Sequence, residues 1–197
     1  GADPRADESF FRAVSAQSAS GQLNWSPAIE IGAPLNTPGN EGALCVSPHG
    51  MNLIITWSSR PDSYGSCDLY SSRKVGSNWS EPINLGSTVN TASWESQPCL
   101  AADGRTLYFV STRAGGHGGS DIWKSVLQDD GSWSTPVNLG DSVNSPGNEM
   151  APFIHPDGRT LYFSSTGHPG MGGADLFVSR LSPQGTWQKP ENLGYPV

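Results

Sequence analysis

The sequence predicts an all-β protein, a β-propeller built of four-stranded antiparallel blades. Three observations lead to this fold class: a repeat of constant period, four strand signals in every repeat, and a proline that marks one strand of each repeat as an edge. The period is seen in the tryptophans Trp25, Trp79, Trp133 and Trp187, which are 54 residues apart (79 − 25, 133 − 79 and 187 − 133). A period in this range indicates a solenoid, a propeller or an array.

Three other residue types keep the same spacing after each tryptophan. A glycine ends each LG phrase, an asparagine and a glutamate follow it, and a second glycine comes later in a turn. These residues are Gly32, Gly86, Gly140 and Gly194; Asn36, Asn90 and Asn144; Glu41, Glu95 and Glu149; and Gly50, Gly104 and Gly158. The repeats therefore run near 25–78, 79–132 and 133–186, and the next one starts at 187–197.

The N-terminal segment 1–22 is interpreted as a tail followed by the end of an incomplete blade. Its stretch SFFRA at 9–13 aligns with DLYSS at 68–72 and DLFVS at 175–179, which predicts a late strand of an earlier unit. Residues 23–197 then form the blades, about 3.5 in all with this partial one. Because propellers typically have roughly 4 to 8 blades, we expect a fragment of a larger propeller or a ring completed by oligomerisation.

The first half of each repeat predicts a hairpin. A short first strand follows the loop that carries the repeated Glu. An Asp-Gly or His-Gly pair then predicts a two-residue turn with positive φ at both positions. The second strand is nearly continuous in apolar residues, so we expect both of its faces to be covered. The first strands are expected at 43–47, 97–101 and 151–155, the turns at 49–50, 103–104 and 157–158, and the second strands at 53–59, 106–112 and 160–166.

The second half of each repeat predicts a third strand and an edge strand. A Gly-rich loop leads to a repeated Asp and the third strand. The fourth strand starts at the repeated Trp and contains a proline, Pro82, Pro136 or Pro190. Proline has no N–H to donate to a sheet ladder, so the fourth strand is predicted to be the outer edge.

Composition and charge exclude several classes of function. The formal net charge is −7 and the pI about 4.9, so nucleic acid and anionic membrane surfaces are not expected partners. No apolar run reaches the roughly 20 residues that span a bilayer, and no direct membrane insertion is expected. Cys45 and Cys99 hold the same repeat position and are predicted to be buried free thiols. With Cys67 they show no zinc spacing, so no metal and no cofactor are predicted.

The phrase DGRTLYFSSTGHPGMGGADLFVSRL resembles the WD40-like repeat with a Pro-Asp-Gly turn found in TolB-type propellers. The linking phrase WS.PVNLG..VN(S/T)PGNE is similar to the propellers of Bacteroidetes OmpA-family, PorE-like outer-membrane lipoproteins of type IX secretion. This resemblance covers about residues 8–197. It implies a protein-interaction platform in a periplasmic, outer-membrane-associated complex. The helical repeats, the lipidated cysteine and the peptidoglycan-binding domain of such proteins have no counterpart in these residues.

Two sets of acidic residues recur. Asp68, Asp121 and Asp175 precede the third strands, and we interpret them as structural acceptors for the N–H groups of their own loops. The glutamates Glu41, Glu95 and Glu149 are candidates for the mouth of the central channel, where they would bind a cation or a basic peptide. The alternative is that each Glu holds the neighbouring loop.

Residues that break the repeat are the candidates for recognition. The loops between the second and third strands place Tyr64, His117 and Met171 at one equivalent tip, and Trp94 replaces the asparagine of the other repeats just before Glu95. Aromatic and methionine side chains are enriched at protein interfaces. These four residues are therefore predicted to contact a partner.

No catalytic residues are predicted. The chain has no G-x-S-x-G motif, and its histidines show no HExxH spacing. The sequence favours a non-enzymatic scaffold that binds envelope proteins. The alternatives are a glycan-binding module or a piece of a propeller glycosidase, whose two carboxylates the glutamates would supply, and the gating propeller of a peptidase.

Overall fold

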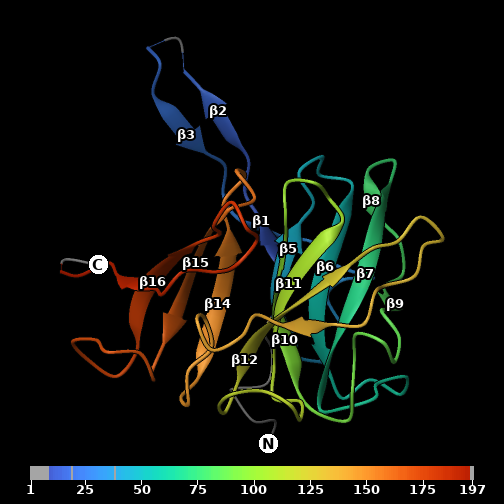
Figure 1. Ribbon diagram of the computed structural model, residues 1–197. Coiled ribbons are helices and arrows are strands. Elements are labelled where there is room, and N and C mark those ends of the chain that lie inside the picture. Colours follow the sequence, from blue (N-terminus) through green and yellow to red (C-terminus); the bar gives the residue numbers. More distant parts are fainter. Residues whose placement is uncertain (1–8, 19, 38, 196–197) are drawn as a thin grey trace, which may run out of the picture.

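Figure 1 shows the computed structural model, which describes residues 9–18, 20–37 and 39–195. Within these ranges the chain forms strands and turns, and none of the described segments is an apolar helix long enough to cross a membrane. Three antiparallel sheets of similar topology follow one another along the chain, and smaller two-stranded pairs precede them. The all-β architecture of four-stranded blades that the repeat predicts is therefore confirmed.

The N-terminal pairs form what we call the half-blade. One pair joins β1 to β4, and the other joins β2 to β3 in a hairpin that projects from the molecule at the top of Figure 1. The expected boundary at residue 22 falls in the loop of this hairpin. The bounds are β1 Phe11–Arg12, β2 Ser15–Gln17, β3 Leu23–Trp25 and β4 Ile29–Glu30.

The half-blade corresponds to the third and fourth strands of a full blade. Phe11 pairs with Glu30 in the same register as Tyr70 pairs with Asn84 in the next sheet. The expected late strand of an earlier unit is therefore present at this position.

The three full sheets are blade 1 (β5 to β9), blade 2 (β10 to β13) and blade 3 (β14 to β17). In each, the strands are neighbours in chain order, so each blade is a meander. The bounds are β5 Glu41–Val46, β6 Asn52–Ser58, β7 Cys67–Val75, β8 Asn78–Trp79, β9 Ile83–Asn84, β10 Glu95–Leu100, β11 Thr106–Ser111, β12 Asp121–Val126, β13 Val137–Asn138, β14 Glu149–Ile154, β15 Thr160–Ser165, β16 Asp175–Arg180 and β17 Glu191–Asn192.

The fourth strand of each blade is the outer edge, as its proline requires. It is also interrupted by that proline. In blade 1 the pairing with β7 is made first by β8 and then by β9, and Pro82 lies between them. In blades 2 and 3, Trp133 and Trp187 each form one isolated antiparallel β-bridge, to Leu127 and Leu181. The short strands β13 and β17 follow the proline.

The hairpin turns between the first and second strands differ from the expected two-residue type. Ala101 and Thr106 close a four-residue loop, in which Gly104 N–H donates to the Ala101 carbonyl. Only the glycines take positive φ, at 67° for Gly104. The Asp side chain instead accepts hydrogen bonds from the following residues, because an Asp at this position caps its own turn.

Hydrophobic cores lie between neighbouring blades. One core joins the half-blade to blade 1, a second joins blade 1 to blade 2, and a third joins blade 2 to blade 3. The inner strand β10 contacts both β5 and β14. The sheets of blades 1 and 2 are thus covered on both faces, which explains their apolar second strands. In blade 3, alternate residues of β15 are buried, because described residues cover only one face of this sheet.

Candidate interaction surface at the loop face

The loops between second and third strands are fixed by the repeated Asp at the start of each third strand. The Tyr64 N–H donates to Asp68 at 2.7 Å, the His117 N–H to Asp121 at 2.6 Å, and the Met171 N–H to Asp175 at 2.8 Å. The next residue of each loop donates to the same carboxylate. These are the bonds that a structural Asp is expected to make.

Two of these loops are packed tightly against the connection to the next blade. A Cβ added to Gly65 would collide with the Ser93 carbonyl, and one added to Gly118 would collide with the Gly147 carbonyl. Glycine is therefore required at both positions for this close approach. We call the surface formed by these loops and by the neighbouring connections between blades the loop face. It comprises residues 59–66, 112–120 and 166–174 of the loops and residues 85–94 and 139–148 of the connections.

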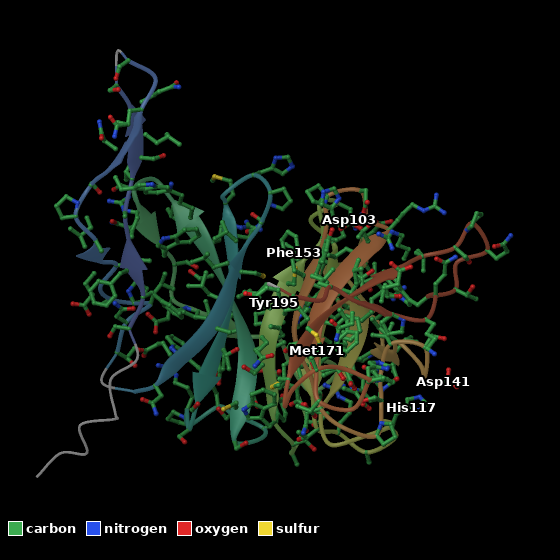
Figure 2. The ribbon with its side chains drawn as sticks, turned by 90° about the vertical axis from the view of Figure 1, so that its left-hand side faces the viewer. Asp103, His117, Asp141, Phe153, Met171 and Tyr195 are labelled. Carbon is green, nitrogen blue, oxygen red and sulfur yellow. The ribbon has the colours of Figure 1, made fainter. Side chains whose placement is uncertain are left out.

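The tip residues of the loop face point their side chains to solvent. Tyr64, His117 and Met171 are all exposed, and they occupy equivalent positions in blades 1, 2 and 3. Figure 2 shows His117 toward the end of the molecule away from the Asp103 turn, and Met171 at a height between the two. A phenol, an imidazole and a thioether are thus exposed on three successive blades, each on a loop whose backbone an Asp carboxylate holds.

Trp94, the fourth candidate for contact with a partner, is less exposed than the three tip residues. Its side chain is half-buried and packs on the core between blades 2 and 3. Its backbone exchanges hydrogen bonds with Thr112 and forms a bridge with Cys67 of the preceding blade. The residue fills space between blades because it lies on the connection that joins them.

The repeated glutamates, which are the candidates for the channel mouth, have enclosed side chains. Glu41, Glu95 and Glu149 begin the inner strands, and their side chains are buried. The Thr91 N–H and hydroxyl donate to the Glu95 carboxylate at 2.7 and 2.8 Å, and Ser111 donates at 2.7 Å. The alternative in which each Glu holds its neighbouring loop agrees with these bonds.

The three glutamates are not equivalent in their partners. Glu149 receives the Ser165 hydroxyl at 2.6 Å, as Glu95 receives that of Ser111. Blade 1 has Trp57 at this register position, opposite Glu41. As a result, Glu41 Oε2 is buried without a hydrogen-bond partner.

Arg113 adds a positive charge to the Glu95 site. Its Nη2 lies 3.3 Å from Glu95 Oε1, and the same nitrogen donates to the Val89 carbonyl. Burial of the guanidinium lowers the pKa of Arg113, and the Glu95 carboxylate partly offsets this. Its guanidinium also lies over the rings of Phe109 and Trp123. A carboxylate so enclosed is unsuited to bind a cation or to act on a sugar.

The repeated asparagines lie on the connections between blades and bind the preceding blade by hydrogen bonds, whereas the sequence identified them only as a landmark. Asn90 accepts from the Leu69 N–H and donates to the Leu69 carbonyl, both at 2.9 Å. Asn144 does the same with Ile122 of blade 2. Each side-chain amide thus pairs with both the N–H and the carbonyl of one residue in the third strand of the preceding blade. The signal was present in the constant spacing of the asparagines.

A groove of about 580 Å³ opens at the rim between blades 1 and 2. Trp133, Leu85 and Leu100 line it, together with the polar residues Asn52 and Arg73. Of the described residues, none that lines this groove is acidic. The groove therefore offers an aromatic surface and hydrogen-bond donors, without the paired carboxylates that glycoside hydrolysis needs.

The described ranges contain neither a cluster of metal ligands nor a disulfide. No group of three or more His, Cys, Asp or Glu side chains there is arranged to hold a metal ion. Cys45, Cys67 and Cys99 are free thiols. Burial raises the pKa of Cys45 to about 12 and also raises that of Cys99. Neither of these two is a poised nucleophile.

Comparison with protein-family models gave no match, and neither did comparison with curated sequences. Among solved structures, TolB from Acinetobacter baumannii is similar, with a TM-score of 0.54 and 10% identity over 90% of this chain and 37% of that one. The GH93 α-L-arabinofuranosidase of Fusarium graminearum has a TM-score of 0.51 and 14% identity over 96% of this chain and 59% of that one. The α-L-arabinofuranosidase from Lactobacillus brevis has values of 0.50 and 14% over 88% and 61%.

These similarities show the β-propeller fold, and the TolB match agrees with the TolB-type resemblance of the repeat. The chain spans less than two thirds of the length of each of these structures. Because one structure is TolB and two are glycosidases, and because identities are at most 14%, the comparison indicates fold and not activity.

Proposed function

We propose that this chain is a non-catalytic β-propeller that binds protein partners through its loop face, in a periplasmic, outer-membrane-associated envelope complex. The observation that carries the proposal is the set of three exposed tips, Tyr64, His117 and Met171, on backbone fixed by Asp68, Asp121 and Asp175. Rigid loops that display aromatic and Met side chains lose little conformational entropy on binding. The envelope location rests on the resemblance to PorE-like proteins.

The acidic residues support a scaffold over an enzyme. The carboxylates of Glu95 and Glu149 already accept hydrogen bonds from a backbone N–H of the preceding connection and from a serine hydroxyl of the neighbouring strand. A general acid or base needs a carboxyl group that reaches the substrate. The side chains left free at the loop face, phenol, imidazole and thioether, fit contact with a protein.

Site-specific photo-crosslinking tests the proposal. Benzoylphenylalanine is placed in turn at positions 64, 117 and 171, and the protein is irradiated in envelope extract of the organism that encodes the chain. We expect one protein to be crosslinked from at least two neighbouring tips, since adjacent blades present them together. Val137, exposed at the outer rim, gives the matched control position. Crosslinks that are equally frequent at position 137, or none from the tips, would refute a binding role for the loop face.

A glycan-binding module remains the second candidate because of the rim groove at Trp133. An indole beside Asn52 and Arg73 provides an apolar surface and polar donors of the kind that ligand pockets combine. Sugar binding on a glycan array that is lost in the Arg73→Ala variant would support this candidate. Arg73 is exposed, so the substitution is expected to leave the fold intact.

A further inference from the structure

The rim groove between blades 1 and 2 differs from the corresponding region of the next interface at one position of the second strand. Ile54 of β6 lines the groove, and it pairs with Cys45 of β5. Tyr108 of β11 pairs with Cys99 in the same register, 54 residues later. Blade 1 thus has an isoleucine where blade 2 has a tyrosine.

The tyrosine of blade 2 packs on the repeated tryptophan of the next blade. The rings of Tyr108 and Trp187 meet edge to face, with centroids 6.5 Å apart, and Tyr108 is 5% exposed. Trp133 is the equivalent of Trp187, since the two are 54 residues apart and each bridges to the leucine that follows its third strand. Beside Trp133, the shorter side chain of Ile54 takes the place of the phenol ring. The space that a ring fills between blades 2 and 3 is therefore part of the open groove between blades 1 and 2.

The lining of the groove combines apolar side chains with a pair of polar ones. Asn52 and Arg73 lie opposite each other on β6 and β7, and both line the groove. Asn52 is two residues from Ile54 in the same strand, so these three side chains stand on the same face of the sheet. Three leucines supply further apolar surface, Leu85, Leu100 and Leu127. The groove therefore has an apolar floor with hydrogen-bond donors at one end.

Arg73 gives the groove a positive charge that its lining does not neutralise. None of the described residues that line the groove is acidic, and no described carboxylate lies within ion-pair distance of Arg73. Arg180 is the equivalent of Arg73 in blade 3, and its Nη1 lies 3.3 Å from Glu191 Oε2. A guanidinium without such a partner, next to the side-chain amide of Asn52, is suited to bind a carboxylate.

We propose that the groove binds a small molecule that carries both an aromatic ring and a carboxylate. The ring takes the position that the Tyr108 ring has in the next interface and packs on Trp133, and Arg73 and Asn52 hold the carboxylate. The volume of about 580 Å³ and the apolar lining with few polar groups are typical of small-molecule sites. The groove lies between two four-stranded blades and is separate from the loop face. The inference therefore does not depend on the proposed protein binding.

A ligand titration followed by NMR tests this site. The probe is hydrocinnamate, and the signal is the indole N–H resonance of Trp133, assigned by its absence from the Trp133→Phe variant. We expect a saturable shift with a dissociation constant on the order of 1 mM or tighter. Cyclohexylpropionate has the carboxylate without the aromatic ring, and phenylpropanol has the ring without the charge. Each of these two analogues should bind roughly 5-fold more weakly than hydrocinnamate.

Two substitutions separate the ring position from the charge. Ile54→Tyr gives blade 1 the ring that blade 2 has at this position, so it should fill the groove and abolish the shift. Arg73→Val introduces the residue type that blade 2 has at the same register, Val126. It should weaken hydrocinnamate binding roughly 10-fold and leave phenylpropanol binding unchanged. Arg180→Val, the matched change in blade 3, should bind hydrocinnamate like the wild type. The dispersion of the amide spectrum shows whether each variant keeps the fold.

Four results would overturn the proposal. One is a Trp133 resonance that does not shift in the wild-type chain at hydrocinnamate concentrations on the order of 10 mM. Others are unchanged hydrocinnamate binding in folded Ile54→Tyr and unchanged binding in Arg73→Val. The last is binding of a neutral disaccharide in preference to hydrocinnamate, which would favour the glycan candidate for this groove.

Discussion

Replacing Asn144 by alanine should destabilise the attachment of the connection 139–148 to blade 2 by about 3 to 5 kcal/mol. The buried amide accepts from the Ile122 N–H at 2.8 Å, donates to the Ile122 carbonyl at 3.0 Å and donates to Asn138 at 2.8 Å. Truncation leaves the Ile122 N–H without a partner, at a cost of about 1 to 3 kcal/mol, and removes two further bonds worth about 1 kcal/mol each. The other two groups lose less, since each keeps a second partner.

Urea unfolding followed by tryptophan fluorescence measures this change. If the free energy of unfolding depends on urea with a slope of about 2 kcal/mol/M, the unfolding midpoint should fall by about 1.5 to 2.5 M. The underlying loss of about 3 to 5 kcal/mol is a large part of the typical stability of a domain, about 5 to 15 kcal/mol. Asn24→Ala, in the exposed hairpin of the half-blade, should change the stability by less than about 0.5 kcal/mol. If the unfolding free energies of the two variants lie within about 1 kcal/mol of each other, the hydrogen bonds of Asn144 do not stabilise the chain as argued.

Three further predictions concern carboxyl and thiol groups. Glu41→Gln should leave the free energy of unfolding nearly unchanged, because Oε2 of Glu41 has no hydrogen-bond partner. Glu95→Gln should lower it by about 1 to 3 kcal/mol, since both carboxylate oxygens of Glu95 accept hydrogen bonds. Urea unfolding of the two variants, measured in parallel, compares these values. The pKa of Asp157 is lowered to about 2, first by the Arg159 N–H and then by the Thr160 hydroxyl, so its contribution to stability is complete above pH 3.8 and is lost as the pH falls toward 2. Carboxyl NMR titration should show this pKa rising toward 3.8 in Thr160→Val, and an unchanged value would contradict the assignment. Cys45, whose pKa is raised to about 12, should react with a thiol reagent at pH 8 far more slowly in the folded chain than in denaturant, and equal rates would refute its burial.

The sequence predicted those features that repeat and that involve neighbours in the chain. The 54-residue spacing located the blades, the prolines located the edge strands, and Asp68 bonds to the loop only a few residues before it. Such short-range relations can be read from spacing and turn chemistry alone. The partial unit at the N-terminus was also found by alignment of SFFRA with the third strands.

Features that depend on pairing register were out of reach of sequence reasoning. Glu95 is buried because Ser111 pairs opposite it, and this partner lies 16 residues away across a hairpin. Trp94 resembled a recognition residue because it interrupts the repeat. However, its environment is set by Thr112 and by the blade behind it. An exception in a repeat thus identifies a residue of interest, and only the structure shows whether it faces a partner or a neighbouring blade.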